Sequence, residues 1–423
     1  MTVVGIDDTD SRTGGMCTTY LGALLADALR AEGATVDRLL LVRCNPAVPH
    51  KTRGNAAVAL HTDCDPERAF SLAEGLIGEY AIVDDPKTNP GLVVTSHGSD
   101  AVPEPVAEFA HRAVTDHLGR EEARVLCSAH GYRFRGWENG RGLIGSLAAV
   151  GSWPLPDPTY ERIVYRERER WGTDREVDPE SVFAAADASY PRVWDTVDRA
   201  TGDVVCVPNT PCPVLYGIRG DDTDAVLEVA ELIESEAVER AETFVTNQGT
   251  DAHLREAPLS GLESGYCYRS SGTVASDPET RAGGHVFFTL ESDDGETEIR
   301  CAAFEPTKRF RDRVRALRPG DRLAVCGEVS GGTLKLEKFA SRGLNRFRCR
   351  NPRCPDCGRS MESAGRDQGY RCRECRTSAP GKERVEVDRD LEIGWYEVPP
   401  TARRHVAKPL VRGGFDAQVH PER

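Results

Sequence analysis

The fold of the first part of the chain is decided by the stretch Thr2-Val3-Val4-Gly5-Ile6-Asp7-Asp8-Thr9-Asp10-Ser11. Its apolar half predicts a short buried strand that ends directly on a cluster of carboxylates. After Gly14 and Gly15, leucines recur at helical spacing from a predicted helix start near Thr18. The sequence therefore predicts a strand, a glycine-containing loop and a helix N-terminus in that order, which is an α/β arrangement.

This order brings Asp7, Asp8 and Asp10 close to the N-terminus of a helix. Free N–H groups at a helix N-terminus bind phosphates, and carboxylate oxygens are ligands that Mg²⁺ prefers. We therefore expect a nucleotide and Mg²⁺ here, although the loop lacks the Walker A pattern. An ordinary capped turn is the alternative. The same letters recur at residues 221–224, where we expect only a helix N-cap.

A polar loop over residues 45–55 precedes a predicted strand over residues 56–60. It carries Lys51 and Arg53, which would supply counter-charges for a triphosphate beside the aspartates. Solvated surface charges are the alternative interpretation of this loop.

The most specific motif pairs Cys354 and Cys357 with Cys372 and Cys375. Two Cys-x-x-Cys turns with fourteen residues between them can close a tetrahedral thiolate site around Zn²⁺. We expect Cys349, just outside this spacing, to be a spare buried thiol, and a role as an alternative zinc ligand is the other interpretation. The chain holds 14 cysteines and we expect it to be cytoplasmic, which favours metal ligation over a disulfide framework.

The charge of the chain is uneven. The whole sequence carries 68 acidic and 54 basic residues, a formal charge of −14, yet residues 341–376 contain ten Arg and four acidic residues. This basic segment predicts a contact with nucleic acid. The candidate contacts are Arg346, Arg348, Arg350 and Arg371. Arg403 and Arg404 would add an RNA-binding arm in the tail, for which a solvated tail is the alternative.

Only seven of the 54 basic residues are Lys, which fits a halophilic host or a GC-rich genome.

The segment before the cysteines predicts a barrel. The expected strands cover residues 268–275, 285–290, 298–304, 322–329 and 333–339, with a helix over residues 306–317. Three strands, a helix and two strands is the order of an OB fold, a common binder of single-stranded nucleic acid. Strand alternation allows at most one of Phe287 and Phe288 to point outward.

Two features argue against a membrane protein. No uncharged apolar run reaches the roughly 18 residues that a spanning helix needs. The first residues contain no basic segment and meet acidic residues at once, so we expect no signal peptide and a cytoplasmic location.

Taken together, these motifs resemble the archaeal isoleucine-tRNA 2-agmatinylcytidine synthetase family. The resemblance rests on residues 5–11, 15–21, 45–55, 216–220 and 246–253, and on the barrel, the cysteine motif and the tail over residues 394–405. It covers nearly the whole chain, and the loop over residues 11–15 is its one local departure. It implies a multidomain α+β fold. The implied parts are an α/β threonine/cytidine kinase-like catalytic domain over residues 1–125, a ferredoxin-like domain over 126–258, an OB-fold barrel over 259–345, a zinc ribbon over 346–380 and a tail over 381–423.

The resemblance also implies an activity. Such enzymes are ligases that condense agmatine onto C2 of the wobble cytidine of the CAU-anticodon isoleucine tRNA, which then decodes AUA. The base is activated by phosphorylation, because its C2 oxygen is a poor leaving group, and ATP yields AMP and two phosphates. The implied partners are this tRNA, agmatine and ATP, with Mg²⁺ and a structural Zn²⁺ as cofactors and no obligate protein partner.

Roles for matching residues follow from the same resemblance. Asp7 and Asp8 would hold Mg²⁺ or assist proton transfer, and the hydroxyl of Thr18 or Thr19, with Thr18 preferred, would be phosphorylated. Asp7, Asp8 and Thr18 are therefore the expected catalytic residues. The residues expected to bind ATP and Mg²⁺ are Asp7, Asp8, Asp10, Gly14, Gly15, Thr19, Lys51 and Arg53. No residue is assigned to agmatine.

Two other classes of protein stay open. A non-catalytic single-strand-binding protein explains the barrel and the cysteine motif but leaves the aspartate cluster unexplained. An ATP-dependent RNA ligase or adenylyltransferase needs a nucleophilic Lys in a Lys-x-Asp-Gly-like context, and none of the seven Lys has one.

Overall fold

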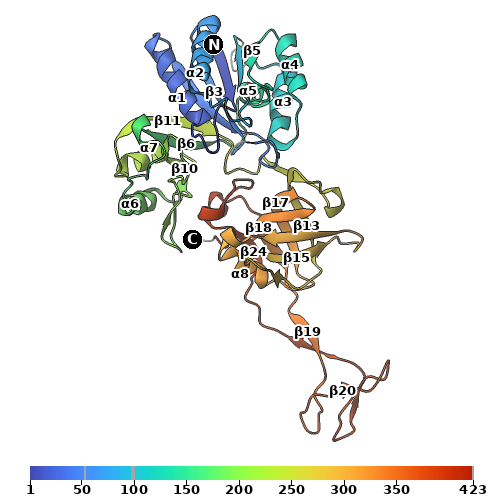
Figure 1. Cartoon of the computed structure of the whole chain (residues 1–423). Coiled ribbons are helices and arrows are strands. Elements are labelled where there is room, and N and C mark those ends of the chain that lie inside the picture. The colour runs from blue at the N-terminus through green and yellow to red at the C-terminus, as the bar shows by residue number, and fades with distance from the viewer. Residues whose placement is uncertain (52–53, 97–100, 422–423) are drawn as a thin grey trace.

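The computed structural model of the chain describes residues 1–51, 54–96 and 101–421. Figure 1 shows a helix-covered sheet that holds the N-terminus, a β-barrel beside it, and a small cysteine-containing unit at the end of a long arm. Among the described residues, none of the helices combines the length and the apolar character that crossing a bilayer requires.

Within the described residues, the largest element is a nine-stranded sheet with the order β5-β4-β1-β3-β2-β11-β6-β10-β7. Its strands are β1 (Thr2–Asp7), β2 (Val36–Arg43), β3 (Ala56–Thr62), β4 (Gly91–Thr95), β5 (Arg133–Gly136), β6 (Thr159–Arg166), β7 (Val193–Trp194), β10 (Val214–Gly220) and β11 (Val238–Thr246). The pairing of β2 with β11 is parallel and puts Leu39 opposite Phe244. Because this pairing joins distant segments, the first two predicted domains share one continuous sheet.

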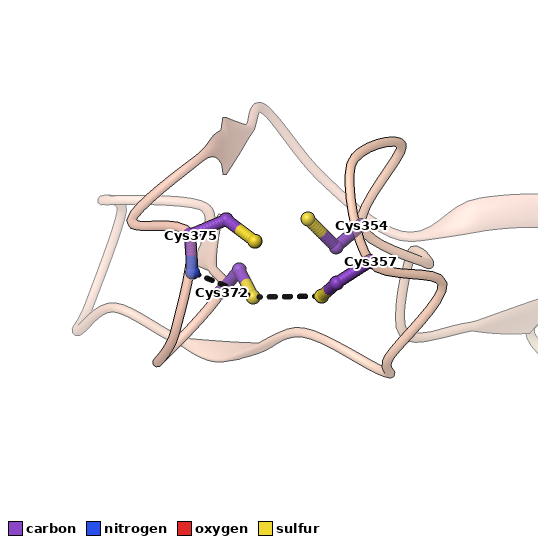
Figure 2. Close-up of side chains that lie close together, drawn as sticks. All are labelled: Cys354, Cys357, Cys372 and Cys375. Atoms are coloured by element: carbon purple, nitrogen blue, oxygen red, sulfur yellow. Dashed lines mark hydrogen bonds between the residues drawn. The ribbon is translucent and has the colours of Figure 1, made fainter.

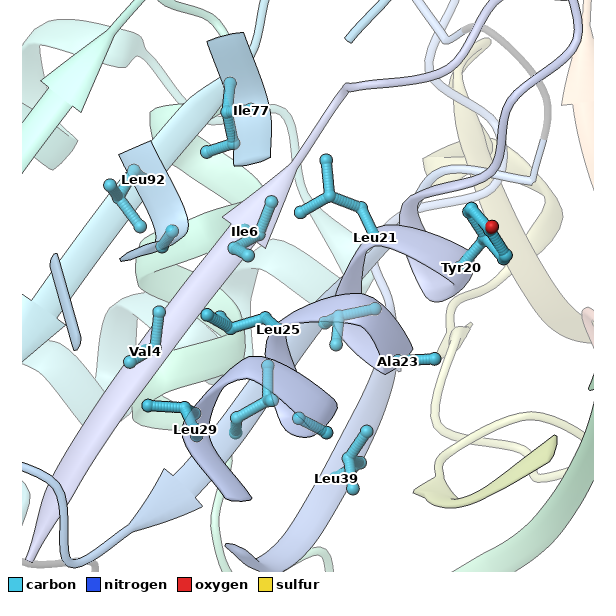
Figure 3. Packing of buried hydrophobic residues seen from close by; sticks show 14 of the residues in the cluster. Val4, Ile6, Tyr20, Leu21, Ala23, Leu25, Leu29, Leu39, Ile77 and Leu92 are labelled. Atoms are coloured by element: carbon cyan, nitrogen blue, oxygen red, sulfur yellow. The ribbon is translucent and has the colours of Figure 1, made fainter. Parts of the chain in front are cut away.

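Helices cover the sheet. They are α1 (Thr18–Ala31), α2 (Pro66–Tyr80), α3 (Glu104–Thr115), α4 (Arg120–Ala129), α5 (Leu143–Gly151), α6 (Pro179–Ser189) and α7 (Thr223–Leu232). Alternation along β1 sends Val4 and Ile6 under α1 and α2, whereas Val3 packs with α5 on the other face. Figure 3 shows Val4 and Ile6 against the leucines of α1. The predicted helix start near Thr18 is confirmed, and α5, beyond residue 125, packs directly on β1.

The barrel confirms the predicted strand order. Strands β13 (Tyr266–Val274), β15 (Val286–Glu291), β16 (Glu298–Ala303), β17 (Arg322–Ser330) and β18 (Thr333–Gly343) pair in the order β13-β17-β18-β16-β15, and β13 pairs again with β15 to close the circle. Helix α8 (Phe310–Arg315) follows β16, as expected. Phe288 is buried in the core, whereas Phe287 is partly exposed beside Arg281 and Arg300. Alternation therefore holds for this pair.

Shorter strands complete the structure. They are β8 (Val197–Asp198), β9 (Asp203–Val204), β12 (Leu254–Glu256), β14 (Glu279–Thr280), β19 (Phe347–Arg350), β20 (Glu362–Ser363), β21 (Tyr370–Arg371), β22 (Ser378–Ala379), β23 (Glu383–Glu386) and β24 (Gly394–Glu397). Strands β19 and β23 pair to form the arm that carries the cysteine unit away from the barrel (Figure 1). Strand β24 then returns to pair with β18, so the tail packs back on the barrel.

Candidate functional site

A cavity of about 400 Å³ lies where the carboxyl end of β1, the N-terminus of α1 and the loop before β3 meet. Its wall includes six of the predicted site residues, namely Asp7, Asp8, Asp10, Thr18, Thr19 and Lys51. The structure thus brings together two polar segments that the sequence predicted as one site. Arg53, predicted alongside Lys51, lies outside the described residues.

Asp7 is the last residue of β1, and its carboxylate packs against α5. A Cβ added to Gly145 would lie 2.1 Å from Oδ2 of Asp7, so the carboxylate fits only because residue 145 has no side chain. Burial raises the pKa of Asp7 well above its usual value, and the nearby Asp8 carboxylate raises it further. A cation bound here would offset both effects, because it favours the charged carboxylate.

Asp8 is held by groups from two distant loops. Its Oδ2 accepts hydrogen bonds from the backbone N–H of Asn89 at 3.2 Å and from Nη2 of Arg141 at 3.1 Å. Nη2 of Arg141 also donates to the carbonyl of Lys87 at 2.9 Å. Asp8 itself has a φ of 57°, a conformation that Asp adopts more readily than most residues. Arg141 is therefore a site residue that the sequence did not assign.

Thr18 and Thr19 lie at the start of α1, in the wall of the cavity. The Thr18 hydroxyl accepts a hydrogen bond from the Thr9 hydroxyl at 3.1 Å, and the Thr19 hydroxyl lies 3.0 Å from Sγ of Cys17. The helix begins without a side-chain cap at Cys17. Its first N–H groups therefore keep the capacity to bind an anion.

Gly14 and Gly15 form the turn before α1 and are not among the residues that line the cavity. The Gly14 N–H donates to Oγ of Ser11 at 2.9 Å, and the Ser11 N–H donates to the Gly15 carbonyl at 3.0 Å. Gly15 has a φ of 82°, and a Cβ there would lie 2.6 Å from the Pro211 carbonyl oxygen. Gly14 and Gly15 therefore have a structural role in the loop, because the backbone turns sharply there and Gly15 lies against the Pro211 carbonyl.

The opposite wall of the cavity comes from β6, β10 and the turn after β11. Glu161 is 4% exposed, forms an ion pair with Nη2 of Arg219 at 2.9 Å and accepts a hydrogen bond from Nε2 of Gln248 at 2.9 Å. Arg219 lies opposite Glu161 in the antiparallel pairing of β10 with β6. Arg219 and Gln248 lie in segments that carry the family resemblance, whereas no sequence signal pointed to Glu161.

The four predicted zinc ligands come together. The Sγ atoms of Cys354, Cys357, Cys372 and Cys375 all lie within 4.8 Å of one another, and Figure 2 shows the two cysteine turns facing each other. Zinc–sulfur bonds of about 2.3 Å in a tetrahedron place the sulfurs roughly 3.8 Å apart, so this arrangement fits Zn²⁺. Although burial opposes ionisation, backbone N–H groups and neighbouring thiols lower the pKa of Cys354 to about 7.

The remaining cysteines are not part of this cluster. All fourteen cysteines lie in the described ranges and are free thiols, as expected without a disulfide framework. Cys349 is exposed, so the expectation of a buried thiol is wrong. It lies on β19, which pairs with β23 in a narrow arm that has no core of its own to bury it.

The predicted RNA-binding arginines fall into two groups. Arg346, Arg348 and Arg371 are exposed near the cysteine unit, and Arg350 pairs with Glu383. The tail arginines lie elsewhere. The side chain of Arg403 is buried and pairs with Asp195 at 2.6 Å and Glu397 at 2.7 Å, and Arg404 pairs with Glu328 at 2.8 Å. These two side chains join the tail to the barrel and the sheet, so this part of the tail is not a free arm, and the Arg404 side chain stays 37% exposed.

Comparison with known proteins gives consistent results. Profiles described as the TiaS TCKD domain, the TiaS FLD domain and the TiaS C-terminal zinc ribbon domain match residues 3–64, 140–253 and 351–391. The chain is 52% identical over 462 residues to the isoleucine-tRNA 2-agmatinylcytidine synthetase TiaS of Haloquadratum walsbyi, with 100% of both chains covered. The acidic, lysine-poor composition fits this relative.

Two solved structures are similar over the full length. A complex of TiaS with its isoleucine tRNA and ATP is 44% identical with a TM-score of 0.90, and 100% of this chain and 99% of that chain are covered. A complex of TiaS with the same tRNA, AMPCPP and agmatine is 41% identical with a TM-score of 0.87, with the same coverage.

Proposed function

The chain belongs to the isoleucine-tRNA 2-agmatinylcytidine synthetase (TiaS) family, and from this premise we propose that it is an ATP-dependent ligase that joins agmatine to an isoleucine tRNA. The observation that carries the proposal is the cavity in which Asp7, Asp8, Thr18 and Lys51 meet. A protein that only binds single strands would not need this cavity, so the non-catalytic alternative is not favoured.

The proposed reaction replaces the C2 oxygen of the wobble cytidine with the amine nitrogen of agmatine. Phosphorylation of that oxygen makes it a good leaving group. The amine then attacks C2, so that a C–N bond forms, the C–O bond breaks, the oxygen departs with the phosphate and the amine gives up a proton. One phosphate of ATP leaves with the C2 oxygen and the other leaves with an oxygen from water, so ATP ends as AMP and two phosphates. The modified tRNA decodes AUA.

The chain's own residues fit this chemistry. Asp7, Asp8 and Asp10 would hold Mg²⁺, which neutralises phosphate charge when bound. Thr18 would be the phosphorylated hydroxyl at the helix N-terminus. Lys51 would balance phosphate charge, and Arg141 keeps the Asp8 carboxylate oriented toward the cavity.

The role that we propose for each domain follows from the family resemblance. We propose that residues 1–125 act as the kinase-like domain and residues 126–258 as a ferredoxin-like domain. Their common sheet supports a joint site, because the cavity has walls from both segments. The barrel and the ribbon, with exposed Arg346, Arg348 and Arg371, would bind the tRNA. Zn²⁺ would be structural, and the enzyme would work in the cytoplasm.

An ATP turnover assay with product analysis tests this proposal. Purified protein in molar KCl with Mg²⁺, agmatine and tRNA carrying a CAU anticodon should form AMP. Mass spectrometry of the anticodon nucleoside should show cytidine gaining the mass of agmatine less water. Tight tRNA binding with no AMP formed and no mass change would favour the binding protein instead.

A prediction about Gly145 tests the geometry of the site. In Gly145→Ala the new methyl group would overlap the Asp7 carboxylate, which must then move. A displacement of about 1 Å near a reacting centre costs on the order of a hundredfold in rate, so we expect turnover to fall by that order. Gly78→Ala in α2 is the matched control, because a Cβ there meets nothing within 4 Å. Equal turnover in the two variants, both folded by thermal unfolding, would contradict the assigned role of Asp7.

A further inference from the structure

A second cavity, of about 350 Å³, adjoins the first. Four residues line both cavities, namely Lys51, Gly54, Ala56 and Gln248. The rest of its wall includes Arg43 at the end of β2, Glu328 of the barrel and residues 403–406 of the tail. The second cavity therefore lies where the sheet, the barrel and the tail meet, in continuity with the proposed catalytic cavity.

Most charged groups in the wall of this cavity are already paired. Arg403 pairs with Asp195 and Glu397, and Arg404 pairs with Glu328 and Glu337. Glu328 is also paired with Lys335 at 3.1 Å, so its carboxylate is balanced from two sides. Each of these carboxylates therefore has a cationic neighbour, and the buried Oε2 of Glu337 has no hydrogen-bond partner among the described residues.

Among the described residues, Lys51 has no carboxylate partner but donates a hydrogen bond to the Pro46 carbonyl, whereas the Arg43 side chain lacks even that. Within the ranges 1–51, 54–96 and 101–421, no residue forms a hydrogen bond or an ion pair with its guanidinium, and its Nε is buried. Nδ1 of His405, in the same wall, is also buried and has no hydrogen-bond partner among these residues. Two polar side chains from distant segments thus present unsatisfied nitrogen atoms around one cavity.

Burying a guanidinium nitrogen without a partner is costly, because that nitrogen loses its hydration and gains no hydrogen bond. Burial lowers the pKa of Arg43 to about 10, so it still carries its charge at neutral pH. Burial lowers the pKa of His405 well below its usual value, so its ring is neutral and can donate a single N–H. A ligand with several acceptor oxygens would satisfy both groups, and the planar guanidinium matches phosphate in a bidentate manner.

We propose that the second cavity is a phosphate-binding subsite in which Arg43 and His405 receive a phosphate group of a phosphorylated substrate. This inference rests on the proposed function, because that function supplies two such substrates, the RNA strand and ATP. The phosphate is either a backbone phosphate next to the modified cytidine or a phosphate of the nucleotide. Both sources offer the same oxygen acceptors, and the experiment separates them.

The test compares Arg43→Met with Arg38→Met. Met preserves the unbranched apolar part of the Arg side chain and lacks the guanidinium. Arg38 lies on the same strand but stacks on Trp153, outside both cavities, and is the matched control. Calorimetry in molar KCl measures binding of an anticodon stem-loop RNA and of ATP to each full-length protein. We expect Arg43→Met to weaken binding of one of these two ligands by about tenfold or more and Arg38→Met to weaken neither.

A neutral methylphosphonate in the RNA, 5′ to the target cytidine, identifies the source. If the backbone phosphate occupies the subsite, the methylphosphonate RNA binds wild type about as weakly as ordinary RNA binds Arg43→Met. The methylphosphonate RNA should then bind Arg43→Met with little further loss of affinity. If a phosphate of ATP occupies it, Arg43→Met weakens ATP binding and the methylphosphonate has the same effect on both proteins.

Unchanged affinity of Arg43→Met for both ligands would overturn the subsite. So would a large fall in the Tm of ligand-free Arg43→Met, because that would show a structural role for a side chain that we infer to lack a partner. Neither measurement needs turnover. Loss of binding in Arg43→Met together with a failed agmatine assay would therefore overturn the proposed function and leave the phosphate subsite standing.

Discussion

Asp8→Asn is expected to lower tRNA-dependent ATP turnover by about a thousandfold or more while leaving the fold and tRNA binding intact. The Asp8 carboxylate is held at the cavity wall by Arg141 and by the Asn89 N–H. Asn keeps the shape of the side chain and tolerates the φ of 57° at this position, but it removes the full negative charge that a cation on the triphosphate needs. AMP formation with tRNA and agmatine in molar KCl measures the loss.

Asp222→Asn is the control for this variant, because residues 221–224 repeat the letters of residues 7–10. Asp222 caps α7 by accepting the N–H of Ala225 at 2.8 Å, and Asn is an equally good N-cap. Its turnover should stay within about twofold of wild type, since the change leaves the cap in place. If Asp8→Asn kept more than about a tenth of wild-type turnover, the charge of Asp8 would not be essential to phosphate chemistry.

Removal of zinc, or the variant Cys372→Ser, is expected to unfold the cysteine unit and abolish tRNA modification. The buried core of this unit in the described residues consists of Cys354, Met361 and Cys372, which is too small to hold a fold alone. In small units of this kind the metal supplies about 10–16 kcal/mol of folding free energy. Metal analysis and limited proteolysis should show zinc loss and new cleavage within residues 351–379. The unfolding temperature of the barrel and the affinity for ATP should be unchanged, because the cysteine unit lies at the end of the β19–β23 arm, away from the barrel (Figure 1).

Cys349→Ser is the matched control, because this cysteine lies on the same arm but is exposed and outside the four-sulfur cluster. It should retain zinc, protease resistance and turnover. A zinc-free Cys372→Ser protein with full activity on tRNA would show that the ribbon is not needed to present the anticodon.

Local patterns predicted those elements whose signals are close together in the chain. The helix start at Thr18, the five barrel strands and the α8 position follow from periodicity and turn residues within short windows. Spacing alone likewise predicted the four cysteines, because each pair lies on one turn. The N-cap at Asp222 was predicted for the same reason.

The ion pairs of Arg403 were not predicted, for a corresponding reason. Its ion-pair partner Asp195 lies in a distant segment, and no local signal marks a surface-type residue for burial between carboxylates. The boundary between the first two predicted domains is also not visible as a break in the structure, because the parallel pairing of β2 with β11 spans it.

The family, the barrel, the zinc ligands and the aspartate-to-helix segment at the site could all be predicted before the structure was known, because each of these depends on residue types at short and regular spacing. Four features depend instead on how distant segments pack: Arg141 holds Asp8, Gly145 makes room for Asp7, Glu161 and Arg219 close the opposite wall, and Nε of Arg43 has no partner among the described residues. These contacts join residues from separate strands and loops. The packing of the sheet, the barrel and the tail decides whether such a side chain contacts a partner or faces a cavity. Periodicity along the chain does not predict which distant segments come into contact.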